Sequence, residues 1–565
     1  MTAIGAQGSA LEAGRHLLTL IQAHPWLFSL AAFLAWFAAR IYVTKYHGPF
    51  SKLPGPKRAH WLIGNGIEVM NLTPKDAHQR WLDGTEGTVK IPRVLGQHYA
   101  CVTDDLKASQ YMWTHPDLFI KPEGGRKILE DALGLGLVAA EGKLHRRQRR
   151  VLNPAFGWPQ LVPMAPTIFE KAYELQRKMF RTLEEPDGGK GVDHVPGKRK
   201  LDVLSFVSQA TLDIISLVGF GYDCQALGDE PNELREAYNQ TLATVFNITL
   251  MSIVQFALGR VAGWIPTERQ RISHAVRAKS QEIGMAIVAE KKAQLLASNN
   301  GVIEKNSQDL GKDCLSLLIK ANMAPDLRDD QRLSDAEVAD QCSTILFAGH
   351  ETTGTGLMWT LYHLACNQDV QEKLRRELLE VDAREPSWDE LNALPYLDAV
   401  VHESLRLDSP VPMSSRVATA NAVIPLSKPI TLTNGEKINE LHVPKGAEVS
   451  TPIAYINTST KIWGPDARSF NPDRFARDGI PAQQTPGVWG NLMTFLAGPR
   501  NCIGHRLTVI EMKIVLFVLI RSFRFEIPPS QPQLKKTWLV IQRCVVVGED
   551  KAGPQMPLMV SAVEN

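Results

Sequence analysis

The chain has 565 residues, with 62 Lys and Arg against 60 Asp and Glu, so its formal net charge is only +2. This near balance argues against a dedicated nucleic-acid-binding protein, and no nucleic acid is expected as a partner. The seven cysteines are scattered and form no CxxC pair, which excludes a disulfide framework or a zinc ribbon and suits a reducing compartment.

An apolar segment near the N-terminus, from Trp26 to Ala39, contains no charged side chain. Together with the apolar residues on either side, it reaches the roughly 20 residues that a membrane-spanning helix requires. We therefore expect a single membrane anchor over residues 17–43, behind a short N-terminal segment of residues 1–16. A cleaved signal peptide is the alternative, although no small-x-small cleavage pattern follows Ala39.

The segment after this apolar stretch is basic, which predicts that the remainder of the chain lies on the cytoplasmic side of the membrane. Residues 44–60 contain Pro54, Gly55 and Pro56, and these residue types predict a stiff, non-helical hinge. We expect one large domain over residues 61–565, because the chain shows no internal repeat and no linker long enough to demand a boundary.

The pattern of apolar residues predicts a mainly α-helical domain with small β-sheets. Short strands are expected first, at Thr88–Ile91 and Tyr99–Thr103, and surface loops at residues 184–200 and 299–312. Helices are expected over residues 201–219, 268–297, 334–364, 368–381 and 506–523. Further strands are expected after Asn421, up to about Val449, and in the tail up to Val563.

One cysteine, Cys502, lies between Gly498 and Gly504, immediately before a predicted helix. A helix N-terminus carries partial positive charge and free N–H groups, which stabilise a thiolate. The two glycines allow the backbone to approach a flat ring closely. From spacing alone, a buried cysteine beside a glycine turn is an equally good interpretation.

Three further motifs are weak when each is taken alone. Glu351 and Thr352 follow Ala-Gly-His in the middle of the long helix predicted over residues 334–364. Glu403 and Arg406 are three residues apart on a helix and share a face, as a surface ion pair also would. Arg474 lies in a Phe-Asn-Pro-Asp-Arg-Phe segment further along the chain.

The segment Phe495–Gly504 resembles the haem-binding loop of the cytochromes P450, FxxGxRxCxG, at every defined position. The resemblance implies the cytochrome P450 fold, with haem b as cofactor and Cys502 as the axial thiolate ligand of its iron. It also implies that Phe495 packs near the sulfur and that Arg500 pairs with a haem propionate.

The other motifs resemble the same family. Glu351-Thr352 is similar to its oxygen-activation motif, which implies that Thr352 binds dioxygen through a hydrogen bond and that Glu351 relays protons. Glu403 and Arg406 match the ExxR motif, and with Arg474 they would form a buried ionic network that fixes the fold near the haem loop. The last segment departs from the family's PERF motif by carrying Asp473 in place of Glu.

Two more propionate contacts follow from the resemblance. The segment from Gly142 to Arg150 is similar to the family's WxxxR helix, where Arg149 is retained and His145 replaces the tryptophan. His145 can still donate a hydrogen bond to a propionate, but this contact departs from the family pattern. Arg416, shortly after the ExxR motif, would be another propionate ligand.

The resemblance to microsomal, fungal-like members implies a membrane-anchored monooxygenase of the endoplasmic reticulum. It would insert one atom of dioxygen into an apolar small molecule. Electrons from NADPH would come from a separate NADPH–cytochrome P450 reductase, with cytochrome b5 as a second partner. Terpenoids, steroids, aromatic compounds, other secondary metabolites and xenobiotics remain open as substrates. Segments expected to line the pocket are residues 119–137, 241–264, 347–352 and 411–413.

The two alternative functions are a haem-thiolate isomerase or dehydratase and a haem-thiolate sensor. A haem-thiolate isomerase or dehydratase would need no reductase, but such relatives often lose the acid–threonine pair, which is intact here. A haem-thiolate sensor would need neither the apolar anchor nor a complete Glu351-Thr352 motif. Both features favour the monooxygenase.

Overall fold

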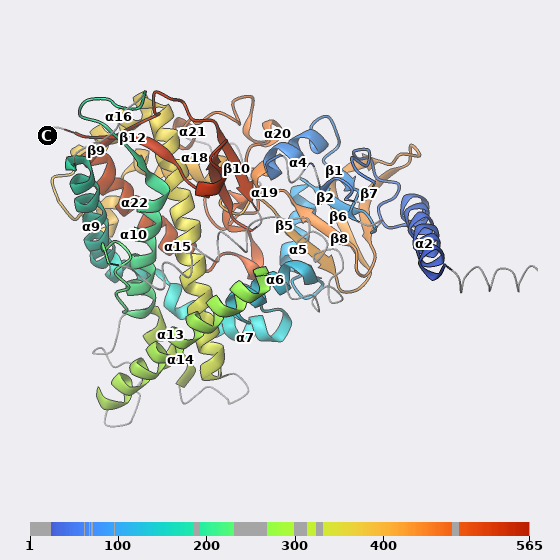
Figure 1. Ribbon diagram of the computed structural model, residues 1–565, viewed down its shortest axis with the longest axis horizontal. Coiled ribbons are helices and arrows are strands. Elements are labelled where there is room, and N and C mark those ends of the chain that lie inside the picture. The colour runs from blue at the N-terminus through green and yellow to red at the C-terminus, as the bar shows by residue number, and fades with distance from the viewer. Residues whose placement is uncertain are drawn as a thin grey trace, which may run out of the picture.

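The helices and strands of this computed structural model are described for residues 24–61, 63–66, 68, 72–94, 97–185, 192–230, 268–298, 313–323, 332–476, 485–538 and 540–563. Within these residues a helix-rich part lies beside a part that is rich in strands, and an N-terminal helix stands at the far side of the strands (Figure 1). The expected class, mainly α with small β-sheets, is therefore confirmed. The predicted loop over residues 299–312 lies outside the described residues.

The helices of the described residues differ widely in length. They are α2 (Pro25–His47), α4 (Pro74–Leu82), α5 (Leu106–Thr114), α6 (Glu123–Leu133), α7 (Gly142–Leu152), α8 (Trp158–Leu161), α9 (Ala165–Glu184), α10 (Val203–Phe220), α13 (Glu268–Ser298), α14 (Cys314–Met323), α15 (Asp335–Cys366), α16 (Gln368–Leu379), α17 (Trp388–Asn392), α18 (Pro395–Leu407), α19 (Ile453–Ile456), α20 (Thr460–Trp463), α21 (Asp473–Ala476) and α22 (His505–Ser522).

The longest of these helices, α15, runs through the middle of the helix-rich part (Figure 1). It begins with a capping box, in which Ser334 and Glu337 each accept a hydrogen bond from the other's backbone N–H. It packs against α10, α13, α18 and α22, so most of its side chains are buried. A helix that is buried on several sides provides a rigid wall for an internal site.

The strands of the described residues form four small sheets. The largest has the order β1 (Thr88–Ile91), β2 (Ala100–Thr103), β8 (Glu448–Thr451), β5 (Ser414–Ala418) and β3 (Phe119–Ile120). The strands β6 (Ala422–Thr431) and β7 (Lys437–Val443) pair with each other, as do β10 (Leu534–Trp538) and β11 (Gln542–Val546). The fourth sheet contains β4 (Arg199–Asp202), β12 (Pro557–Ala562) and β9 (Phe523–Glu526).

The strands predicted after Asn421 are present, beginning with β6 at Ala422, but the preceding strand β5 was not predicted. The strand β5 already begins at Ser414, which lies opposite Thr451 of β8 in an antiparallel pair. Its sequence, Ser-Ser-Arg-Val-Ala, shows no clear alternation of apolar residues. Pairing with a strand that is distant in the sequence therefore decides this element.

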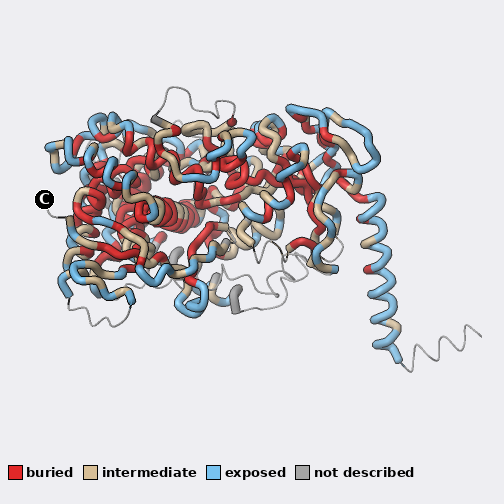
Figure 2. Tube along the Cα trace, turned by 90° about the horizontal axis from the view of Figure 1, so that it is seen from above, coloured by how far each residue is buried: buried red, intermediate tan, exposed pale blue. Residues whose placement is uncertain are grey.

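The N-terminal helix α2 projects from the body, and most of its length is exposed (Figure 2). It is long and apolar enough to cross a membrane, and only 11% of its most apolar window is buried. Phe37, a buried residue of this helix, contacts Trp61 with ring centroids 5.8 Å apart. The helix α10 is also apolar, but 67% of its window is buried, which identifies it as a core helix. The first residues of the predicted anchor, 17–23, lie outside the described residues.

Candidate active site

A cavity of about 720 Å³ lies where the strand-rich and helix-rich parts meet, between α15, the start of α22 and the strands around β5. Its wall is mainly apolar, as in pockets that bind small apolar molecules. Three predicted segments contribute to it: residues 119–137 and 411–413 in part, and Phe347, Ala348 and Thr352 of α15. The predicted segment 241–264 lies outside the described residues.

Cys502 lies at the floor of this cavity, and its accessible surface faces the cavity rather than the outer solvent. The loop before it turns sharply at Leu496 and Gly498, which both have positive φ. At Gly498 a Cβ atom would lie 2.4 Å from the carbonyl oxygen of Trp113, so this position requires glycine. The Cys502 N–H donates to the Phe495 carbonyl, at 2.9 Å, and closes the loop.

The surroundings of the Cys502 sulfur act in opposite directions on its ionisation. Burial raises the pKa of the thiol, whereas the N–H groups of Gly504 and His505 and the charge of Arg149 lower it. The two N–H groups belong to the first turn of α22, as expected from the sequence. Phe495 also lines the cavity close to this loop.

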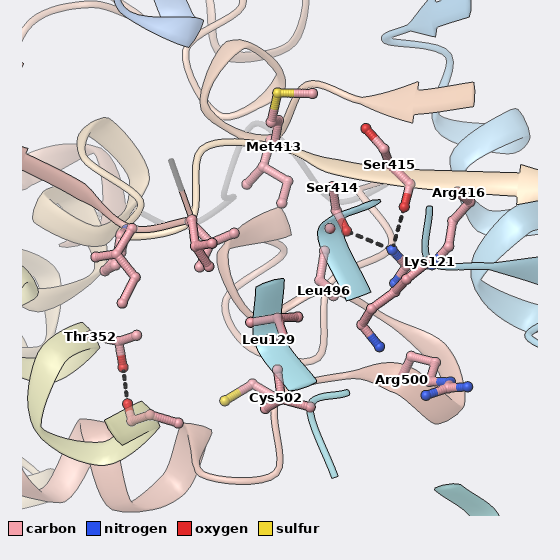
Figure 3. A pocket seen from close by; sticks show the side chains of 18 of the residues that line it. Lys121, Leu129, Thr352, Met413, Ser414, Ser415, Arg416, Leu496, Arg500 and Cys502 are labelled. Carbon is pink, nitrogen blue, oxygen red and sulfur yellow. Dashed lines mark hydrogen bonds between the residues drawn. The ribbon is translucent and has the colours of Figure 1, made fainter. Parts of the chain in front are cut away.

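Three cationic side chains lie together on one side of the cavity, across from Thr352, with Cys502 between the two sides (Figure 3). They are Lys121, Arg416 and Arg500. Arg416 is buried, stacks 4.4 Å from the ring centroid of Trp113 and donates to the Ser414 hydroxyl and the Ser415 carbonyl, each at 2.8 Å. Burial lowers the pKa of Arg416 to about 10.

The carboxylate of Glu141 forms ion pairs with two of these cations. It pairs with Arg500 and, at 3.3 Å, with the Lys121 ammonium group. The pKa of Lys121 is lowered to about 7, mainly by burial and also by the charges of Arg416 and Arg500, while Glu141 opposes this shift. The cluster therefore has an excess of positive charge that an anionic group in the cavity would neutralise. Lys121 was not predicted, because an isolated Lys-Pro dipeptide carries no signal by itself.

The helix α7 contributes two further predicted residues to the cavity. His145 is buried and lines the cavity, and its pKa falls to about 3 because of burial and four neighbouring cations. Arg149 donates to the carbonyl and the side-chain oxygen of Asn501, at 2.7 and 2.5 Å, and to Asn153 at 2.8 Å. Arg149 thus contacts the residue immediately before Cys502 and helps to fix the loop.

The two residues of the predicted acid–threonine pair point to different surroundings. Thr352 lines the cavity, and its hydroxyl donates to the Ala348 carbonyl one turn earlier, at 2.7 Å. Glu351 does not line the cavity; it is buried behind it and pairs with Arg543 and with His350, whose Nε2 lies 2.9 Å from its carboxylate. Sequence reasoning missed Arg543, which is 192 residues away in the tail.

A second buried carboxyl group, Glu511 of α22, was also missed by the sequence analysis. It lines the cavity, and it is 1% exposed. Burial raises the pKa of Glu511 well above its ordinary value. Its residue type, between the apolar residues Ile510 and Met512, was the signal available in the sequence.

Glu403, Arg406 and Arg474 lie together, and none of them lines the cavity. The Glu403 carboxylate accepts from the Arg406 Nε at 2.7 Å, and the Arg474 Nε lies 3.6 Å from the same carboxylate. Arg406 also donates to the carbonyls of Asn457 and Ala467, at 2.7 and 2.6 Å. The Glu403 and Arg406 side chains are completely buried, so hydrogen bonds must compensate their lost hydration.

This geometry fits the class of haem-thiolate enzymes. A cysteine sulfur at a helix N-terminus faces an apolar cavity, and the excess cations on one side match the two carboxylates of a haem. Comparison with known proteins places the chain more narrowly, since the family model described as Cytochrome P450 matches residues 54–546.

Several characterised relatives match almost the whole chain. Cytochrome P450 monooxygenase 128 of Postia placenta is 38% identical over 552 residues, which cover 95% of this chain and 97% of the relative. Cytochrome P450 monooxygenase 205 of the same fungus is 37% identical, with coverage of 94% and 96%. Cytochrome P450 monooxygenase claO of Ampulloclitocybe clavipes is 30% identical, with coverage of 92% and 94%. The chain belongs to the cytochrome P450 family and is a monooxygenase of that family.

Proposed function

We propose that Cys502 ligates the iron of haem b through its thiolate and that the haem propionates lie against Lys121, Arg416 and Arg500. The observation that carries this proposal is the shared cavity, in which the cysteine sulfur and the cation cluster occupy different sides. His145 and Arg149 lie on the same cavity wall. Because the pKa of His145 is low, a neutral ring that donates one hydrogen bond is its expected form.

The reaction that we propose is the insertion of one oxygen atom into a C–H bond of an apolar small molecule. In balance, the substrate, dioxygen, two electrons and two protons give the hydroxylated product and water. The haem supplies the oxygen chemistry when it is bound. The protein orients the substrate, excludes water and moves the two protons.

Different residues around the cavity would bind the substrate and dioxygen. Phe347, Val411, Met413 and Ile541 present apolar surface on the substrate side and would hold the molecule by burial of its surface. Thr352 presents a hydroxyl at the point where α15 faces the cavity and would hydrogen-bond dioxygen or a water that replaces it. The apolar wall favours terpenoid, steroid or aromatic substrates over charged ones.

Electrons come from NADPH through a separate reductase in this proposal, with cytochrome b5 as a second donor. The outer face of α7 supports it, since Lys143, Arg146 and Arg150 are exposed there, on the helix that carries Arg149. A basic face attracts an acidic redox partner and increases its association rate. Arg146 already pairs with Asp117, so part of this charge is neutralised.

The helix α2 would anchor the protein in the endoplasmic reticulum membrane, with the catalytic domain in the cytoplasm. Its exposed apolar side chains, and the basic residues Lys45 and His47 in its last turn, favour this orientation. The membrane would also concentrate apolar substrates close to the domain.

Two measurements test the proposed function. The reduced protein with carbon monoxide should give the absorbance maximum of thiolate-ligated haem, and its absence would contradict the ligation by Cys502. NADPH consumption should require added NADPH–cytochrome P450 reductase and should rise when an apolar substrate is added. Turnover of a hydroperoxide without reductase and NADPH would indicate an isomerase instead.

A further inference from the structure

Glu351 is enclosed in a buried cluster of charges behind the cavity wall. Its carboxylate pairs with the Arg543 guanidinium and with Nε2 of His350 at 2.9 Å, and its side chain is 6% exposed. His350 Nδ1 lies 2.7 Å from the Leu346 carbonyl oxygen, so both ring nitrogens face oxygen acceptors. Across the helix, α10 places the neutral Thr211 hydroxyl 3.0 Å from the His350 carbonyl. Among the described residues, the titratable groups that pair with Glu351 are Arg543 and His350.

These charges keep the carboxylate ionised. Although burial raises it, the attraction of Arg543 and His350 holds the pKa of Glu351 at about 2. A carboxylate that is ionised and bound by two donors at neutral pH neither carries a proton nor reaches the cavity. For Glu351 to take part in proton transfer, it must first separate from Arg543.

Arg543 follows closely after two residues that line the cavity, Val540 and Ile541. It is the second residue of β11, which begins at Gln542 and pairs with β10. Ile541 lines the cavity two residues before Arg543, and Thr352 lines it one residue after Glu351. A molecule that occupies the cavity thus contacts a residue within two positions of each partner of the ion pair.

The hairpin is held in place on its other face. The Gln542 side chain donates to the Asp408 carboxylate at 3.0 Å, and the Gln542 N–H donates to the Pro410 carbonyl at 2.7 Å. Lys536 of β10 also pairs with Asp408. These contacts hold the hairpin at Gln542, between Ile541 and Arg543, so a displacement of Ile541 by an occupant would also shift Arg543.

We propose that Arg543 is a positioning residue that withholds the Glu351 carboxylate from the cavity until a bound molecule displaces Ile541 and separates the ion pair. The inference rests on the proposed function, because it assigns Glu351 to proton transfer next to Thr352. Beyond that function, Arg543 in the tail of the chain controls Glu351, and protons are delivered only when the cavity is occupied.

The first test compares full-length haem-loaded protein in lipid nanodiscs, with reductase and without added substrate. The variants are Arg543→Met, Arg543→Lys, Glu351→Gln and the Arg543→Met/Glu351→Gln double variant. Dioxygen reduced to peroxide takes two electrons and two protons, and dioxygen reduced to water takes four of each. Peroxide released per NADPH therefore reports how often the later protons arrive.

We expect Arg543→Met to lower the peroxide released per NADPH at least threefold, because Glu351 then reaches the cavity without an occupant. Arg543→Lys keeps the charge and should remain close to the unchanged protein. In the Glu351→Gln background, Arg543→Met should have no further effect. A change of the same size in both backgrounds would overturn the proposal, because it would show that Arg543 acts on the fold and not through Glu351.

The second test needs no electron donor, so it separates this proposal from the proposed function. In the unchanged protein, the pKa of Glu351 lies below its unfolded value of 4.5. The ion pair therefore contributes stability at pH 7 that is lost as the pH falls through this range towards about 2. Without Arg543 the buried carboxyl should have a raised pKa, and its contribution should instead decline as the pH rises above 4.5.

The melting temperature of Arg543→Met, relative to the unchanged protein, should therefore fall further at pH 7 than at pH 4.5, and Glu351→Gln should abolish this difference. An equal deficit at both pH values would overturn the pairing. If NADPH supports no turnover but this pH dependence is observed, the proposed function is wrong, whereas the ion pair between Glu351 and Arg543 is still supported. If Arg543→Met does not fold, Arg543→Gln, which also removes the charge but remains polar, replaces it in both comparisons.

Discussion

At the scale of single residues, the site depends on a few side chains whose role is set by what surrounds them. Cys502 is one of seven cysteines, yet it lies at a helix start and faces the cavity. Cys101 and Cys314 are fully enclosed, and burial raises the pKa of both thiols, that of Cys314 to about 12. Such thiols are inert packing residues, so position and not residue type distinguishes Cys502 as the proposed iron ligand.

Replacement of Cys502 by alanine should remove the thiolate-type absorbance of the reduced protein with carbon monoxide and abolish turnover. The physical reason is that no other described cysteine lines the cavity. Cys366→Ala is the matched control, because this cysteine is exposed on the end of α15 and should leave the spectrum unchanged. A thiolate-type spectrum from Cys502→Ala would refute the assignment.

The buried ion pair of Glu403 and Arg406 gives a prediction about stability. Arg406→Met leaves the Glu403 carboxylate buried with fewer donors, which typically costs about 3–5 kcal/mol. Urea unfolding should show this loss in the free energy of unfolding. The control is Asp473→Asn, which removes an exposed pair with Lys373 and should cost at most about 1 kcal/mol. Equal losses from both variants would show that the buried network is not special.

At the scale of elements, the packing of α10 against α15 decides the shape of the cavity wall. Gly349 of α15 faces Ile215 of α10, and both residues line the cavity. A Cβ atom on Gly349 would lie 2.5 Å from Ile215 Cγ1, so the two helices approach as closely as they do because Gly349 has no side chain. The same glycine precedes the Glu351-Thr352 pair, and the packing thereby fixes the position of that pair.

Gly349→Ala should therefore destabilise the protein by about 1–3 kcal/mol, as overpacked cores usually do. Ile215→Val should recover part of this loss in the double variant, because it removes one methyl group at the contact. Gly219→Ala provides the control on α10, since its Cβ atom would meet neighbours at an ordinary 3.7 Å. Thermal unfolding measures all four proteins, and a Gly349→Ala protein as stable as Gly219→Ala would contradict the packing argument.

At the scale of the whole molecule, the chain has two parts with different surroundings. The body encloses the cavity, while α2 lies outside it and exposes Trp26, Leu30, Phe33 and Trp36. Exposed apolar side chains over this length are unfavourable in water but favourable in a bilayer. The contact of Phe37 with Trp61 connects the two parts.

Deletion of residues 1–47 should move the protein from the membrane fraction to the soluble fraction while the haem spectrum is retained. The reason is that the cavity and the Cys502 loop are built from residues after this segment. Sedimentation with lipid vesicles and the carbon monoxide spectrum measure the two properties. If the truncated protein binds vesicles as strongly as the full-length protein, surfaces of the body, such as the exposed Trp61, bind the membrane as well.

The sequence by itself determined the class of fold, the long helix α15 and the identity of the loop around Cys502. These features depend on local patterns: apolar periodicity, a capping box and a loop of fixed spacing. The tertiary structure alone decided which groups meet across long separations. Arg543 reaches Glu351 over 192 residues, and Lys121 joins Arg416 and Arg500 beside Glu141. No local pattern encodes such contacts, because they depend on how distant elements pack.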